Sequence, residues 1–299
     1  MTGLTTKRIA LSTGVTLNVQ LGGAEGGEAI LLLHGFPESH RTWRAVAPAL
    51  AEDYFVVAPD QRGFAGSDRP EGVENYRPER TIEDVIALAD ALGLKRFTLV
   101  GHDWGGAIAW GAALRHPDRI KRLVIVNAPH PLVFQKSVIE DADQRAASQY
   151  IRAFRNPGME AGIAAMGLEA FFEKGFGGHV DLAIVPPEEK RAYLDDWARP
   201  GALTAMLNWY RASELVVPAV GEDAALPAWV NLPFPPVTVP TLVVWGLRDK
   251  ALLPVQLAAL HEHVPDLRTA ATPEAGHFIP WEYPDFVIAA IRDFIAETP

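Results

Sequence analysis

An aspartate occupies the position in this chain that is best suited to a nucleophile. Residues 99–106 read LVGHDWGG, so an apolar run leads into Asp103, small residues flank it, and helical spacing follows. A strand, a tight turn and a helix in this order are typical of a nucleophile elbow. A carboxylate is already an anion at neutral pH, so Asp103 needs no base and can displace a leaving group at a saturated carbon. The residue therefore favours alkyl transfer over the acyl transfer of a serine.

Two further ionisable residues follow apolar runs later in the chain. Asp249 ends the sequence WGLRD, and His277 lies in EAGHF, before the last helical segment. Side chains just past the carboxyl ends of parallel strands gather at one edge of a sheet. Asp249 taken alone is equally typical of a turn, and His277 of a structural histidine. Their positions after strand ends make both of them candidates for the same site as Asp103.

The elements that must position these residues alternate along the chain. Continuous apolar runs predict buried strands at 29–33, 54–58, 97–100, 123–126 and 242–245, and an antiparallel edge is expected from 7–11 and 16–21. Helical spacing occurs at 43–51, 82–92, 106–115, 255–263 and 286–295. Because strands and helices alternate, we expect a mostly parallel α/β sheet with right-handed crossovers.

The alternation stops after Asn127 and resumes near Thr241. Helical spacing at 144–154, 161–172 and 188–211 indicates that the intervening segment is a helical cap over the strand ends. The predicted division is a core at 1–130, a cap at 131–238 and a second core segment at 239–299. The proline-rich stretch 233–240 is interpreted as the crossing back to the sheet.

Bulk composition excludes several function classes. The 299 residues include no cysteine, which rules out disulfides, thiolate metal sites and a cysteine nucleophile. A net charge of −10 argues against a nucleic-acid partner. No apolar run is long enough for a membrane span, and the first twenty residues do not resemble a secretory signal, so we expect a cytoplasmic protein with no membrane partner. The sequence leaves a monomer or a homodimer open.

The chain order of nucleophile, acid and histidine resembles that of the α/β-hydrolase fold, and the resemblance extends from His34 to the last helix. It implies a mostly parallel eight-stranded sheet with helices on both faces and an inserted helical cap. It also implies an oxyanion hole built from the backbone amides of Phe36 and Trp104, with a cis bond between Phe36 and Pro37. His34 and His102 are expected to support these residues rather than to react.

Two segments of the expected cap resemble the tyrosine-bearing segments of epoxide hydrolases: YIRAFRNPG, which starts at Tyr150, and LNWYR, which contains Tyr210. Residues 34–43 and 55–70 and the run NAPHP at 127–131 match that family as well. The resemblance implies that Asp103 opens an epoxide while both phenols protonate its oxygen, and that His277 then activates water, with no metal or cofactor. The expected substrate-binding side chains are Phe36, Trp104, Phe154 and Phe278.

Other activities stay open at this point. Haloalkane dehalogenases use the same type of nucleophile, and Trp197, Trp209 or Trp229 could supply a second indole to a halide, although the Phe36 side chain offers no donor. A fluoroacetate dehalogenase is less favoured, because Trp104 occupies a place where those enzymes carry arginine. A non-catalytic ligand-binding protein is less favoured too, since it need not retain Asp103, Asp249 and His277.

Overall fold

The computed structural model describes residues 3–24 and 26–298. Its centre is an eight-stranded sheet in the order β1-β2-β4-β3-β5-β6-β7-β8. The strands are β1 (Thr5–Ala10), β2 (Thr16–Gly23), β3 (Ala29–Leu33), β4 (Phe55–Pro59), β5 (Phe97–His102), β6 (Ile120–Val126), β7 (Thr241–Gly246) and β8 (Leu267–Thr272). The predicted α/β fold is confirmed, including the mostly parallel sheet.

The sheet is antiparallel only along one edge. β1 pairs with β2 and β2 with β4 in antiparallel register, whereas every pair from β4 to β8 is parallel. A turn at Ser12 to Gly14 joins β1 to β2, and Gly14 adopts a φ of 86° there. The five parallel pairings aim the carboxyl ends of β3 to β8 at one edge of the sheet, where Asp103, Asp249 and His277 follow their strands.

Side chains of the central strands alternate between two hydrophobic cores. In β3, Leu31 and Leu33 face one core, and Ile30 and Leu32 face the other. β7 repeats the pattern, with Val243 on one face and Leu242 on the opposite face. A parallel strand covered on both faces therefore appears in the sequence as a continuous apolar run.

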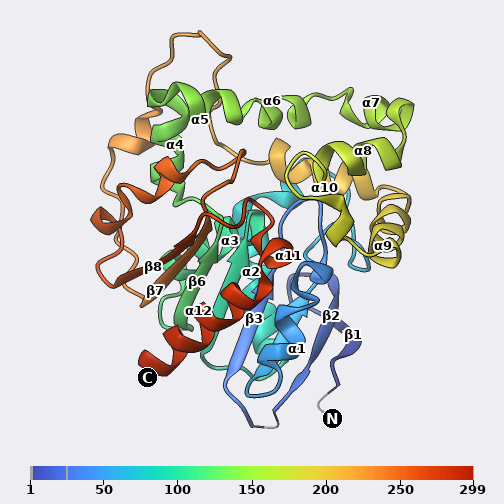
Figure 1. The fold of residues 1–299 in the computed structure, drawn as a ribbon, viewed down its shortest axis with the longest axis vertical. Coiled ribbons are helices and arrows are strands. Elements are labelled where there is room, and N and C mark those ends of the chain that lie inside the picture. Colours follow the sequence, from blue (N-terminus) through green and yellow to red (C-terminus); the bar gives the residue numbers. More distant parts are fainter. Residues whose placement is uncertain (1–2, 25, 299) are drawn as a thin grey trace.

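Helices cover both faces of the sheet (Figure 1). Side chains of α1 (Val46–Leu50) and α12 (Pro284–Glu297) pack in one core, and those of α2 (Pro78–Ala91) and α3 (Trp104–Arg115) pack in the other. The short helix α11 (Ile279–Glu282) precedes α12, and 3₁₀ helices lie at His40–Trp43 (η1) and Val73–Tyr76 (η2).

The segment between β6 and β7, residues 127–240, contains helices and no strand; we call it the insertion. Figure 1 shows its helices together beyond the strand ends. They are α4 (Pro131–Glu140), α5 (Ala142–Ala147), α6 (Gln149–Arg155), α7 (Met159–Met166), α8 (Leu168–Gly175), α9 (Pro187–Trp197) and α10 (Ala202–Arg211), with 3₁₀ helices η3 (Leu182–Ile184) and η4 (Ala228–Asn231).

The insertion helices are shorter than predicted. The expected helix 188–211 is two helices, because Pro200 and Gly201 separate them and Gly201 adopts the left-handed conformation with a φ of 74°. The expected helix 161–172 breaks in the same way at Gly167, where φ is 88°. The expected helix 144–154 divides at Ser148. Left-handed backbone ends a helix, and glycine adopts it without strain.

The predicted helix at 255–263 is wrong. The chain there forms two 3₁₀ helices, η5 (Pro254–Leu257) and η6 (Leu260–Glu262). Its backbone bonds run to the third residue back, as from the Gln256 amide to the Leu253 carbonyl. The side chains of Gln256 and Leu260 are buried. Apolar spacing in so short a segment does not distinguish the two kinds of helix.

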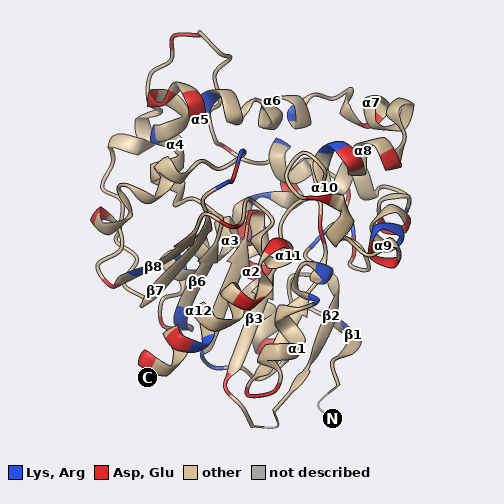
Figure 2. Cartoon of the chain, in the orientation of Figure 1, with Lys and Arg blue, Asp and Glu red and all other residues tan. Residues whose placement is uncertain are grey.

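Charged residues of both signs are interspersed. Figure 2 shows acidic and basic positions next to one another along α9, where Arg191 pairs with Asp195. In the part of the chain that the structure describes, no helix combines the length and the apolar character needed to cross a membrane.

A buried ion pair connects the turn after β4 to α2. The Arg62 guanidinium donates from Nε and Nη2 to the Asp84 carboxylate at 2.7 Å each, and both side chains are almost fully buried. The hydroxyl of Thr13 also contacts Asp84. Removing one partner of such a pair leaves the other charge buried and uncompensated.

We therefore expect Asp84→Ala to lower the free energy of unfolding by about 3–5 kcal/mol, because Arg62 loses its partner. Urea denaturation at neutral pH measures this. Glu83→Ala is the matched control: the neighbouring Glu83 pairs with Arg80 on the exposed face of α2, and its loss should cost less than about 1 kcal/mol. Equal effects of the two substitutions would contradict the assignment.

Candidate active site

Asp103 lies in a sharp turn between β5 and α3. Its backbone has a φ of 51° and a ψ of −120°, which non-glycine residues rarely adopt. A Cβ atom on Gly105 would clash with the Leu33 backbone, and one on Gly106 would clash with Ala128. The small residues around Asp103 thus let the helix pack tightly against the strands, which is how an elbow holds its side chain at the edge of a sheet.

The backbone after β3 meets the Asp103 carboxylate. The Phe36 amide donates a hydrogen bond of 2.8 Å to Oδ1 of Asp103. The Phe36–Pro37 peptide bond is cis, as predicted. Among the described residues, no hydrogen bond joins the Trp104 amide to Asp103, so its place in the oxyanion hole stays a prediction. One carboxylate oxygen is therefore held by backbone, and Oδ2 faces the histidine.

His277 lies between the two aspartates. Its Nδ1 is 2.8 Å from Oδ2 of Asp249, and its Nε2 is 3.6 Å from Oδ2 of Asp103. The imidazole is buried. The structure thus brings together the three residues that the sequence singled out, from positions up to 174 residues apart.

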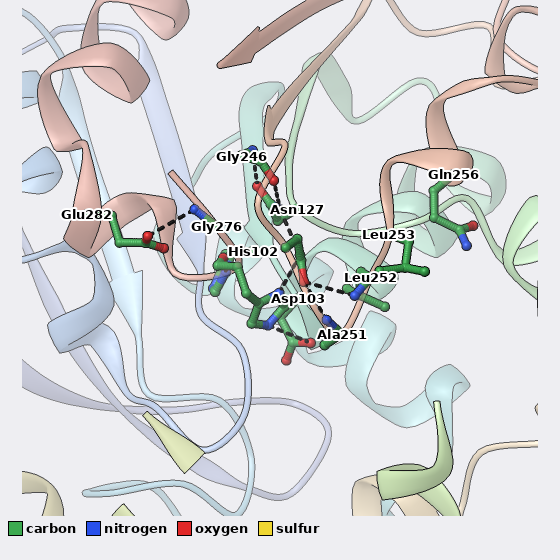
Figure 3. Close-up of polar contacts among 12 residues, drawn as sticks. His102, Asp103, Asn127, Gly246, Ala251, Leu252, Leu253, Gln256, Gly276 and Glu282 are labelled. Atoms are coloured by element: carbon green, nitrogen blue, oxygen red, sulfur yellow. Dashed lines mark hydrogen bonds and ion pairs between the residues drawn. The ribbon is translucent and has the colours of Figure 1, made fainter. Parts of the chain in front are cut away.

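Backbone and amide donors surround the Asp249 carboxylate (Figure 3). Oδ1 accepts hydrogen bonds from the amides of Ala251 and Leu252 at 2.8 and 2.9 Å, and Oδ2 accepts one from Nδ2 of Asn127 at 2.7 Å. Burial alone would raise the pKa of Asp249, but the charge and hydrogen bond of His277 and these donors hold it below its ordinary value. Asp249 is therefore a fixed anion at neutral pH.

The electrostatic environment favours protonated His277 in the free protein. Burial alone would lower its pKa, but the charge and hydrogen bond of Asp249, followed by the charge of Asp103, raise it to about 9. Neutralising Asp103 would remove one of these contributions, lower the pKa of His277 and leave more of the imidazole unprotonated and able to accept a proton.

A second buried pair holds the backbone of His277. Nε2 of His102 lies 2.8 Å from the His277 carbonyl, and its Nδ1 lies 3.1 Å from the Glu38 carboxylate. Trp281 donates to the other oxygen of Glu38 at 2.8 Å. Burial opposes ionisation of Glu38, yet its bond and charge interaction with His102 keep its pKa below the ordinary value. His102 thus supports the site, as expected, and sequence reasoning missed Glu38.

Two tyrosines of the insertion face the elbow. Tyr150 of α6 and Tyr210 of α10 have ring centroids 6.0 Å apart. Arg155 of α6 donates to the carbonyls of Tyr210 and Ser213 at 2.9 Å each, which ties the two helices together. Burial first, and the charge of Asp103 second, raise the pKa of both phenols well above 10. Both phenols therefore stay protonated at neutral pH.

Aromatic rings surround Tyr210. Those of Phe36 and Phe154 have centroids 5.0 Å from it, and that of Trp104 lies 5.1 Å away. These three predicted substrate-binding side chains form one apolar wall beside Asp103. Phe278 does not join this wall, because it stacks on Phe176 at 4.6 Å.

The indoles considered as halide donors are largely occupied. Nε1 of Trp209 donates to the Arg62 carbonyl at 3.0 Å, and Nε1 of Trp197 donates to the Pro37 carbonyl at 2.8 Å. Both side chains are buried. They connect the insertion to the core. Trp229 lies half-buried on η4.

Asn127 has a structural role that sequence reasoning did not assign. It follows β6 with a φ of 40°, exchanges hydrogen bonds with the backbone of Gly246, and reaches Asp249. Asparagine after a strand end is a usable signal, since it tolerates left-handed backbone better than most residues. Across residues 3–24 and 26–298, no cluster of three or more potential ligands was found that could hold a metal ion.

Comparisons with known proteins agree with this geometry. Residues 28–284 match the alpha/beta hydrolase fold family. An AB hydrolase superfamily protein from Bacillus subtilis is 35% identical over 95% of this chain and 96% of its own. Epoxide hydrolase A from Mycobacterium tuberculosis is 32% identical over 98% of each chain. A solved structure, described among novel epoxide hydrolases in metagenomes from hot environments, has a TM-score of 0.91 and 44% identity, and covers 98% of this chain and 99% of that one.

The raised pKa of His277 makes stability depend on pH. Its folded pKa of about 9 exceeds the ordinary 6.5, so the folded state binds the proton more tightly. The resulting stabilisation of the folded state is complete below a pH of 6.5 and is lost as the pH rises through about 9. Over that interval we expect the free energy of unfolding of the unmodified protein to fall by about 3 kcal/mol more than that of His277→Gln. Parallel pH profiles of the two proteins in urea denaturation would contradict this.

Proposed function

Because this chain belongs to the epoxide hydrolases of the alpha/beta hydrolase family, we propose that it converts an epoxide to a vicinal diol through an ester on Asp103. The observation that carries this proposal is the position of Asp103. Its carboxylate lies 3.6 Å from Nε2 of His277, which pairs with Asp249, and its charge helps to keep the phenols of Tyr150 and Tyr210 protonated. Cleavage of an ester, an alkyl halide or an epoxide needs a nucleophile in each case. Opening of an epoxide also needs a proton donor near the epoxide oxygen.

The first step alkylates Asp103. Phe36 holds Oδ1, so Oδ2 attacks one epoxide carbon from behind. The new carbon–oxygen bond forms as the ring bond to oxygen breaks, and a phenol of Tyr150 or Tyr210 gives its proton to the released oxygen. A hydroxyalkyl ester and a phenolate result.

The second step hydrolyses the ester. Alkylation removes the charge of Asp103, which lowers the pKa of His277, so the imidazolium gives its proton to the phenolate and the neutral imidazole can act as a base. His277 takes a proton from water, and the hydroxide adds to Cγ of Asp103 while the Phe36 amide stabilises the oxyanion. As the intermediate collapses, the carboxylic acid proton passes to the departing alkoxide, and His277 keeps the proton taken from water, which restores the protonation state of the free protein.

The insertion is proposed to act as a cap domain, residues 131–238, over the core segments 1–130 and 239–299. It supplies both tyrosines and Phe154, whereas the core supplies Phe36 and Trp104. An apolar wall of this kind suits an uncharged epoxide with a hydrophobic substituent. The haloalkane alternative has weaker support, because Trp197 and Trp209 already donate to backbone carbonyls.

Trapping the ester tests the nucleophile and the leaving group together. His277→Gln should alkylate and then stop, because the base is missing. We expect the intact mass after treatment with styrene oxide to rise by one substrate, with the adduct mapping to Asp103. His277→Gln combined with Asp103→Asn is the control and should show no adduct. A butyl ester from 1-bromobutane, with none from styrene oxide, would instead support the dehalogenase.

The tyrosines are tested by removing only their hydroxyl groups. Tyr150→Phe combined with Tyr210→Phe should slow alkylation by about 10²–10⁴-fold, the usual contribution of general acids. Stopped-flow or quenched single-turnover kinetics with styrene oxide measure the rate. Tyr193→Phe is the matched control, because Tyr193 is a buried insertion tyrosine that packs on Phe176 instead. Unchanged alkylation in the double variant would disprove the assignment.

A further inference from the structure

The loop after β7 is held by hydrogen bonds within the loop and by hydrogen bonds from the insertion. Residues 249–253 curl so that the amides of Ala251 and Leu252 bind the Asp249 carboxylate. Two other backbone groups of this loop point to the insertion. The Ala251 carbonyl accepts a hydrogen bond of 2.9 Å from Nε2 of Gln144, and the Leu253 amide donates one of 2.8 Å to its Oε1. One side chain of α5 therefore clamps the loop on both sides of Leu252.

The Gln144 carboxamide uses its full hydrogen-bonding capacity. Besides the two bonds to the loop, Nε2 donates to Oγ of Ser148 at 3.0 Å, and Oε1 accepts from Nε2 of Gln256 at 2.9 Å. Two donors and two acceptor sites are all that a carboxamide has, and this one is completely buried. The pattern fixes which end carries oxygen and leaves no equally good rotamer.

Neighbouring residues hold Gln144 at the start of its helix. The Asp141 carboxylate caps α5 by accepting the Gln144 amide at 2.7 Å. Gln256 of η5, which Figure 3 shows beyond Leu253, also donates to Oγ of Ser137 in α4 at 2.7 Å. The clamp thus connects α4 and α5 to the segment that follows Asp249.

We propose that Gln144 is a positioning residue, through which the insertion keeps Asp249 in the orientation that His277 needs to activate water. The proposal rests on the proposed function. Hydrogen bonds join the Gln144 carboxamide to the backbone of Ala251 and Leu253. The Ala251 amide in turn donates to Oδ1 of Asp249, and Oδ2 of Asp249 binds Nδ1 of His277.

Gln144 should act on one half of the reaction. Alkylation uses Asp103, the Phe36 amide and the tyrosines, and among the described residues Gln144 forms no side-chain hydrogen bond with any of them. Ester hydrolysis needs the imidazole in one tautomer and one orientation, and the Asp249 carboxylate sets both. A loop free to shift would loosen that bond and slow only the second step.

The decisive variant is Gln144→Met, which keeps the length of the side chain and removes its hydrogen bonds. Under single-turnover conditions with styrene oxide, acid quenching and intact mass give alkylation from the rise of the ester and hydrolysis from its decay. We expect hydrolysis to slow by about 10–100-fold, as for other residues that orient a reacting group, and alkylation to change by less than about twofold.

Gln135→Met is the matched control. Gln135 of α4 is also fully buried, and its carboxamide exchanges bonds of 2.9 and 2.8 Å with the backbone of Val216, far along the chain from the Asp249 loop. It should leave both rates unchanged. Slower alkylation in Gln144→Met, or slower hydrolysis in the control as well, would overturn the proposal in favour of a purely structural role.

The pH profile of ester decay gives a second measure. A weaker bond to Asp249 should lower the pKa of His277, so the midpoint of the rise in rate should move to lower pH. Other charged or titratable groups around the imidazole are unaltered in the variant; they are Asp103, which the ester neutralises, with Glu38, His102, His179 and Glu282. An unmoved midpoint would contradict a role through Asp249.

Gln256→Met covers the case in which Gln144→Met does not fold. It removes one of the four bonds of the clamp, so hydrolysis should slow in the same direction by a smaller factor. Wild-type ester decay in every folded variant would overturn the proposal. The proposed function fails separately, since His277→Gln would then form no ester at all.

Discussion

The hydrogen bond between Asp249 and His277 is the interaction on which this structure depends most. A buried carboxylate is costly unless donors surround it, and the chain meets that requirement with two amides, an asparagine and the imidazole. These donors come from three different parts of the fold. The amides need the turn after β7, Asn127 needs the end of β6, and His277 needs the loop after β8. The parallel sheet brings all three ends to one edge.

Local patterns predicted the fold well because each central strand is buried on both faces. Apolar runs such as Ala29–Leu33 leave few alternatives, and Asp103, Asp249 and His277 stand out as polar residues just beyond such runs. The insertion was harder, because helical spacing continues across Gly167 and Gly201 although the backbone turns there. Glu38 and Gln144 gave no local signal. Their roles come from partners 64 and more than 100 residues away, which only the folded chain brings close.

The site divides its work between rigid and adjustable parts. Backbone amides and strand ends fix the carboxylates, whereas both phenols and Phe154 belong to helices of the insertion. Changes at Tyr150, Phe154 or Tyr210 can therefore alter what fits beside Asp103 while the charge relationships among the two aspartates and the imidazole persist.

The indole bonds of Trp197 and Trp209 have a consequence for access. Both join the insertion to backbone carbonyls of the core, and both are buried. Lifting the insertion as one body would unpair these donors together with the Gln144 clamp, at about 1–3 kcal/mol for each buried group. Rigid-body opening of the insertion is therefore energetically costly in this protein. We therefore expect a molecule that reaches Asp103 to pass between side chains while the insertion stays on the core, so that access selects substrates separately from the fit at the carboxylate.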